Sequence, residues 1–283
     1  MFRLFSIVVA VAALIAATSV VVAAPPADDK NPTWTPVLPV HELKPFAEQI
    51  ADALKKPVEA LAGGQLDEDD RERAVKKARG LTLFLAAGAQ TTAGTGDGSE
   101  KRGPLFNGAM QLDQALRGGK FGDAKSILDA LPAGTNFDKP PFSPAPLADP
   151  RGRDDALAAL MAQFRIRAAG SLGVEPRPKE RTDDGLEAML KLVADKGNAP
   201  LKPDELARLA YRLAVMAEAI RSLPPRPKAE KDPAKWLNWS AEMRTASLEL
   251  ANTAGKGDRA LTRQAALRVS RSCVDCHRVF RDN

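Results

Sequence analysis

The stretch GDRALTRQAALRVSRSCVDCHRVFRDN, residues 257–283, closes the chain. Its first part is typical of the start of a helix, because Asp258 is a capping residue type that directly follows a glycine. Apolar side chains then recur at helical spacing, for example at Leu261 and Val269. This pattern predicts a helix that begins at Asp258 and continues to Phe280.

The end of this predicted helix carries the pattern Cys-x-x-Cys-His, formed by Cys273, Cys276 and His277. Two thiols at this spacing can form thioether bonds with the two vinyl groups of one porphyrin, and the next histidine can ligate the iron. The pattern uses both cysteines of the chain and one of its two histidines. It predicts one covalently attached haem c with His277 as the proximal iron ligand.

Three other kinds of site use cysteines in a similar way. A thioredoxin-type redox pair is expected in a chain of alternating strands and helices, and this sequence shows no such alternation. A structural zinc ion needs a fourth ligand, and only the distant His41 is left to provide it. A disulfide between the two cysteines leaves the adjacent histidine without a role. Haem attachment accounts for all three residues of the pattern.

The N-terminal residues 1–24 have the order of a secretory signal peptide. Arg3 is followed by an apolar run over residues 4–22 and then by two small alanines. Because c-type haem is attached outside the cytoplasm, this signal agrees with the C-terminal pattern and predicts a periplasmic protein. Pro25 is poorly accepted directly after a cleavage site, so cleavage a few residues away, or retention as a membrane anchor, stays open.

The composition predicts an all-α fold. Alanine and leucine dominate after the signal, aromatic residues make up 5% of the chain, and β-branched runs of alternating polarity are missing. The formal charge of +5 is spread among acidic residues at helical spacing and forms no basic run, so we expect no nucleic-acid partner. No stretch after the signal is long and apolar enough to predict a membrane span.

Prolines divide the chain into its expected parts. Residues 25–39 hold five prolines and are expected to form an extended lead-in, and residues 132–150 hold six and are expected to form a linker. Residues 40–131 are then predicted to be an N-terminal helical domain without haem, and residues 151–283 to be the domain that carries it. The helices expected from the apolar pattern are 41–61, 67–89, 104–116, 121–131, 153–169, 182–195, 203–223, 234–254 and 258–280.

Three segments of the second half resemble one family, the class II c-type cytochromes or cytochrome c prime family. They are DPAKWLNWS at residues 232–240, Gly257-Asp258, and SCVDCHRVFR at residues 272–281. Members of this family are four-helix bundles with haem attached near the end of the last helix, and their final motif commonly reads Cys-x-x-Cys-His-x-x-Phe/Tyr-Arg. The resemblance covers residues 182–283. It implies a four-helix haem bundle in which Arg281 lies beside the proximal pocket, and the same arginine also suits the negative end of a helix.

Counting along an up-and-down bundle indicates which other residues lie near the haem. Cys273 is about fifteen residues into the last helix, or roughly 22 Å from its start. The neighbouring helices reach the same level near Ile220, Trp236 and Trp239, which we therefore expect around the haem. For the opposite face of the iron, the first candidate for a sixth ligand is Met161, on the helix that precedes the expected bundle.

These observations predict a periplasmic cytochrome that transfers single electrons to redox partner proteins and is not an enzyme. A sixth site without a ligand would instead favour reversible binding of NO or CO, and a structural or interaction protein with an accessory haem is a further alternative. The order of glycines, helices and loops in residues 40–131 parallels that of the second half, which suggests a duplicated bundle. Two unrelated bundles with glycine loops would also look alike, and a homodimer is left open.

Overall fold

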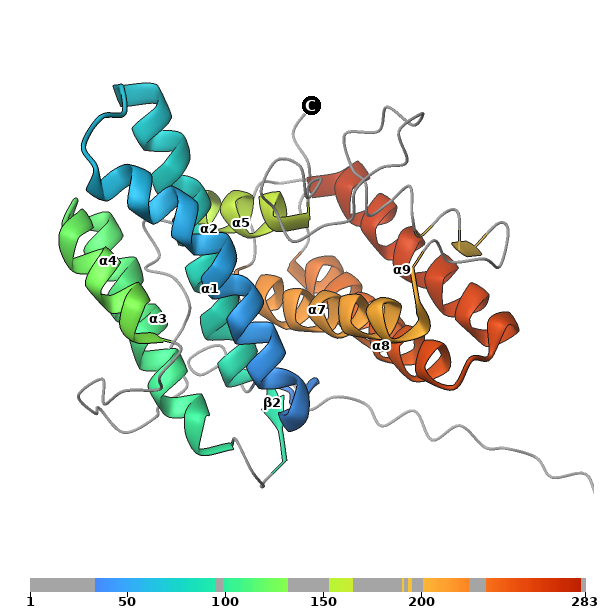
Figure 1. The fold of residues 1–283 in the computed structure, drawn as a ribbon. Helices are drawn as coiled ribbons and strands as arrows, with labels where there is room; N and C mark the ends of the chain where they lie inside the picture. Colours follow the sequence, from blue (N-terminus) through green and yellow to red (C-terminus); the bar gives the residue numbers. More distant parts are fainter. Residues whose placement is uncertain are drawn as a thin grey trace, which may run out of the picture.

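The computed structural model describes residues 34–94, 99–131, 153–164, 190, 193–194, 201–223 and 233–280. In these residues the protein is all-α, as the sequence predicts, and two short strands are the exception (Figure 1). The helices are α1 (Val40–Ala62), α2 (Glu68–Gln90), α3 (Arg102–Arg117), α4 (Phe121–Ala130), α5 (Arg153–Met161), α7 (Pro203–Arg221), α8 (Pro233–Gly255) and α9 (Arg259–Phe280), with the 3-10 turns η1 (Ser99–Lys101) and η4 (Ala162–Phe164). The expected signal peptide, the proline-rich linker and Arg281 lie outside the described residues.

The first four helices form a closed bundle, in which each helix contacts its neighbours in the order α1, α2, α3, α4 and α4 contacts α1 again. Asp67 caps α2, and its carboxylate accepts a hydrogen bond from the Asp70 amide at 2.7 Å. The short strands β1 (Leu38–Pro39) and β2 (Thr92–Ala93) pair in parallel at one end of this bundle. This end is where the chain enters α1 and leaves α2.

Helix α2 lies at the centre of the molecule, and its C-terminal half is buried on every side from Gly80 to Gln90. It contacts α1 and α3 within the bundle, and α5 and α7 outside it. Glycine permits the close approaches: a Cβ at Gly88 would overlap the ring of Phe46, and one at Gly80 would overlap the backbone of Ala159. Small residues in α2 therefore allow helices to pack on opposite sides of it.

The second group of helices consists of α7, α8 and α9, in which α8 packs between α7 and α9. Arg268 of α9 reaches Glu242 of α8 at 2.9 Å and also pairs with Glu249. The helix expected at residues 182–195 is described at three positions, Leu190, Val193 and Ala194, all helical and buried. The Arg263 side chain donates a hydrogen bond to the Ala194 carbonyl, so this segment lies against α9.

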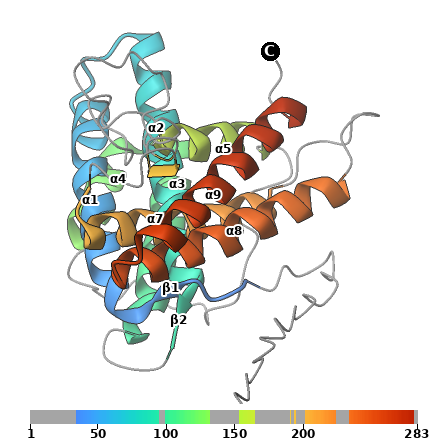
Figure 2. The same cartoon turned by 90° about the vertical axis from the view of Figure 1, so that its right-hand side faces the viewer.

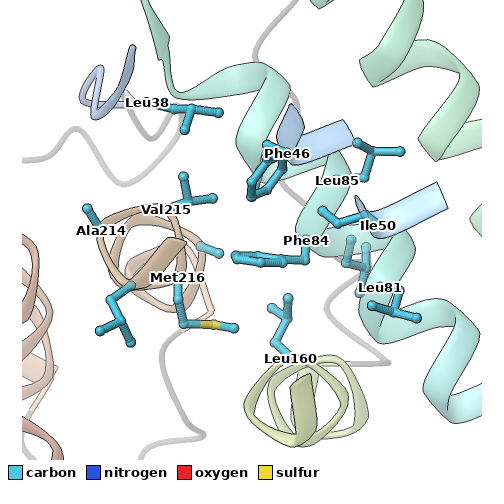
Figure 3. Close-up of a cluster of buried hydrophobic side chains, with 14 of the residues drawn as sticks. Leu38, Phe46, Ile50, Leu81, Phe84, Leu85, Leu160, Ala214, Val215 and Met216 are labelled. Atoms are coloured by element: carbon cyan, nitrogen blue, oxygen red, sulfur yellow. The ribbon is translucent and has the colours of Figure 1, made fainter. Parts of the chain in front are cut away.

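One hydrophobic core runs through both groups of helices. Figure 1 shows α1–α4 on one side and α7–α9 on the other, with α5 between them. In Figure 3, Phe84 of α2, Leu160 of α5 and Met216 of α7 point toward one another, and all three side chains are fully buried. The first helix of the expected second domain, α5, therefore packs against the central helix of the first.

Candidate functional site

The candidate site lies at the C-terminal end of α9, whose start the sequence places correctly. Gly257 has a positive φ of 70°, a conformation that suits glycine and turns the chain out of α8. The Asp258 carboxylate then accepts a hydrogen bond from the Leu261 amide at 3.0 Å and caps the helix. From this capped start α9 continues without a break to Phe280, so the whole Cys-x-x-Cys-His pattern is helical.

Cys273 and Cys276 form no disulfide, and both side chains lie toward the protein interior. Cys276 is 8% exposed and belongs to the hydrophobic core, while Cys273 is half-buried and packs against that core. Their spacing of three residues puts them on one side of the helix, one turn apart. His277 directly follows and is half-buried. The three residues of the pattern therefore lie together on two successive turns of α9.

Burial raises the pKa of the Cys276 thiol to about 11. The physical cause is desolvation, because a thiolate loses its water shell in apolar surroundings. At neutral pH this thiol is therefore protonated. The environment of Cys276 thus suits an apolar group at this position.

The register between α8 and α9 gives the level of the two tryptophans. Arg268 pairs with Glu242 and Glu249, and the two helices run antiparallel after a tight turn (Figure 2). Cys273 lies five residues after Arg268 on α9. On the antiparallel α8 it therefore lies opposite about residue 240, which is about five residues before the midpoint between Glu242 and Glu249. The same count, continued by three and four residues, places Cys276 and His277 opposite about residues 236–237 of α8.

Trp236 connects the C-terminal end of α7 to the part of α8 that lies opposite the cysteines. Its indole is 2% exposed and donates a hydrogen bond to the Ile220 carbonyl at 2.9 Å. Trp239, one turn later on α8, is half-buried against the core. The structure thus brings Ile220 and both tryptophans to the end of the α7–α9 group that carries the cysteines, which is the level that residue counting predicts for them.

Met161 is the last residue of α5 and is half-buried against the core. Its helix packs on α2 and α7, where the neighbouring Leu160 meets Phe84. Both views show α5 on the side of the molecule toward which the C-terminal end of α9 points (Figures 1 and 2). The role of Met161 as an iron ligand stays a prediction.

A buried carboxylate near this site was not singled out by the sequence. Glu218 of α7 has a fully buried side chain, which pairs with Arg244 of α8 at 2.6 Å and with Arg221 at 2.8 Å. It also accepts a hydrogen bond from the Thr35 amide at 3.1 Å. An acidic residue inside the apolar run of α7, with an arginine three residues later, is the signal that points to such a pair.

His41, the second histidine, stands at the start of α1 with its side chain 74% exposed, beside Glu42. The described residues hold no group of three or more His, Cys, Asp or Glu side chains placed to bind a metal ion. No helix in the described part of the chain has both the length and the apolar character of a membrane span. No protein-family model, curated protein or solved structure matches the chain.

Proposed function

We propose that the chain is a monohaem c-type cytochrome that transfers single electrons. The observation that carries this proposal is the Cys-x-x-Cys-His pattern on the last turns of α9, with both cysteine side chains turned toward an apolar interior. The all-α fold of the described residues supports it, because a thioredoxin-type pair is expected in a chain of alternating strands and helices. The residues present fit a covalently held porphyrin.

Each residue of the site has a defined part in this proposal. Cys273 and Cys276 would hold the haem through thioether bonds, and an imidazole nitrogen of His277 would ligate its iron. When bound, the haem supplies a one-electron Fe(III)/Fe(II) couple. Trp236 and Trp239 would shield the site from water, and a site with little water changes the reduction potential of its metal.

The proposed location is the periplasm, and the proposed role is that of an electron carrier and not of an enzyme. The secretory pattern of residues 1–24 supports export, which haem attachment of this type requires. By its resemblance to the cytochrome c prime family, the haem would lie at the end of the last helix, and Arg281 beside it.

The first test is covalent haem attachment. The full chain is produced with a haem-maturation system, and the mature protein is analysed by mass spectrometry. We expect the mass of one haem on the peptide that contains Cys273 and Cys276, and its loss when both are replaced by alanine. His277→Ala should change the spectrum of the bound haem, because the iron loses its proximal ligand.

His41→Ala is the matched control for His277→Ala, since it removes the other histidine at an exposed position. It should leave both the haem content and the spectrum unchanged. A mature parent protein whose mass shows no haem on the two cysteines would refute the proposal.

A second test addresses the opposite face of the iron. If Met161 ligates the iron, Met161→Ala should alter the reduced-state spectrum and lower the reduction potential, because methionine ligation raises that potential. The parent should then react slowly with CO, and the variant quickly. An unchanged spectrum would exclude Met161, and rapid CO binding by the parent would favour the gas-binding alternative.

A further inference from the structure

The outer side of α9 presents four exposed side chains in one row: Leu267, Arg271, Val274 and Arg278, here called the α9 stripe. Steps of four, three and four residues keep side chains in line along a helix. Leu267 and Val274 are 40% and 43% exposed although both are large apolar residues. Single exposed apolar residues are ordinary, but here two of them alternate with two arginines.

The α9 stripe lies on the helix side opposite to Cys276. Val274 is two residues before that cysteine, which is a rotation of about 200° around the helix axis. The stripe and the candidate haem site are therefore separated by about one helix diameter, roughly 10 Å. A partner seated on the stripe would be close to the site without having to displace any part of the core.

Most of the charged side chains of α9 are positive. Between Arg259 and Phe280 the helix carries five arginines and a single acidic residue, Asp275. Asp275 pairs with the exposed Arg278 at 3.1 Å, and Arg268 is neutralised by α8. Arg271 has no acidic partner within the part of the chain that the structure describes. Among the described residues, the acidic side chains therefore leave an excess positive charge on the stripe unbalanced.

This excess charge selects the kind of partner. A second copy of the chain placed on the stripe would bring arginines against arginines, which costs energy. An acidic surface would complement them, and the net charge of +5 would attract such a partner at longer range. The two apolar side chains would form the dry centre of a small contact, a size that is typical of transient electron-transfer encounters.

We propose that the α9 stripe is the docking surface for an acidic electron-transfer protein. This inference rests on the proposed function, because it names the partner of the same site. The arginines steer the partner to the helix, and Leu267 and Val274 fix it there. Exchange of one electron then takes place across α9.

The first experiment measures electron transfer to an anionic probe, hexacyanoferrate(III), by stopped flow with the reduced full-length holoprotein. The double variant Arg271→Glu/Arg278→Glu should lower the second-order rate constant about tenfold at low salt, since charge steering is lost. The control Lys76→Glu/Lys120→Glu makes the same change in net charge at exposed positions of the first bundle. It should change the rate by less than about twofold.

The second experiment does not depend on the haem. A photo-crosslinking amino acid is placed at position 267 or 274 of the full chain in its own cells, with position 261 as the control. Leu261 is also exposed on α9 but lies on a different side of the helix. We expect an adduct with an acidic redox protein from the two stripe positions, and its loss in the arginine-to-glutamate variant.

Either of two results would overturn the docking surface. One is equal slowing of the probe reaction by the stripe variant and the lysine control. The other is the absence of an acidic adduct from positions 267 and 274, or an equal adduct from position 261. Failure of the proposed function is recognised separately, because a parent protein without covalent haem would show it by mass before any partner is tested.

Discussion

At the scale of single residues, the surroundings of Cys276 decide its chemistry. The side chain lies in the hydrophobic core, so ionisation of the thiol is costly and its pKa rises to about 11 from an ordinary value near 9. Cys273, one turn earlier, is only half-buried. The two cysteines of one motif therefore differ in their exposure to solvent.

This difference predicts the pH dependence of alkylation in haem-free protein. With Cys276 as the sole cysteine (Cys273→Ala), the rate of iodoacetamide reaction should rise with pH toward a midpoint near 11 in the folded state. In urea the midpoint should return to about 9, because the unfolded thiol is hydrated. A folded-state midpoint at or below 9 would contradict the burial argument.

The raised pKa of Cys276 also predicts how the free energy of unfolding changes with pH. Below about pH 9 the thiol is protonated in both states and contributes no pH dependence. As pH rises from 9 toward 11, the unfolded chain loses this proton first, which stabilises the unfolded state. The free energy of unfolding should therefore fall over this window in haem-free Cys273→Ala and fall less when Cys276 is also replaced by alanine.

Residue patterns were enough to single out the two cysteines and His277, because the spacing of Cys-x-x-Cys-His is a local feature of the chain. They also placed Ile220 and Trp236 at one level, and the indole–carbonyl hydrogen bond shows the two in contact. The pairing of Glu218 with Arg244 and Thr35 was not foreseen. It joins residues far apart in the sequence, and helical periodicity carries no information on such contacts.

At the scale of elements, the ends of the helices follow from local chemistry. The helices expected at 41–61 and 203–223 are observed as Val40–Ala62 and Pro203–Arg221. Glycine pairs, prolines and capping acids mark these ends, and each acts within a few residues. Contacts between helices depend instead on side chains that are far apart in the sequence. The buried Glu218 of α7, which pairs with Arg244 of α8, is an example.

Replacement of Glu218 should destabilise the protein strongly. Glu218→Gln removes the charge that balances Arg221 and Arg244 in a buried setting, so we expect a loss of about 3–5 kcal/mol of unfolding free energy. Glu242→Gln is the control, because its pair with Arg268 is exposed and should cost less than about 1 kcal/mol. Urea denaturation of both variants measures the difference, and similar losses would contradict the role of burial.

At the scale of the whole molecule, the two groups of helices share one core. Helix α5 packs on α2, and Thr35, which precedes α1, is bound to Glu218 and Arg244 of the second group. The first group therefore contributes to the stability of the helices that carry the candidate site. This arrangement links residues 34–131 to the proposed function, although they contain no cysteine.

A fragment of residues 151–283 should accordingly be less stable than the full chain. Without α2, the faces of α5 and α7 that carry Leu160 and Met216 would be exposed to water. We expect a lower melting temperature by circular dichroism and a tendency to aggregate, while the full chain unfolds in a single transition. A fragment that melts at the temperature of the full chain would show that the two groups are independent.

The sequence by itself determined the all-α class, the bounds of helices such as Val40–Ala62 and Pro203–Arg221, and the residues of the Cys-x-x-Cys-His pattern. These features depend on interactions within a few turns of chain, such as the Asp258 cap or the one-turn spacing of the thiols. Only the tertiary structure decided that α5 packs on α2, that Thr35 reaches Glu218 and that Cys276 lies in the core. Those contacts form between surfaces that are far apart in the sequence and that exclude water when they pack against each other. The local spacing of residues does not encode which of these surfaces meet.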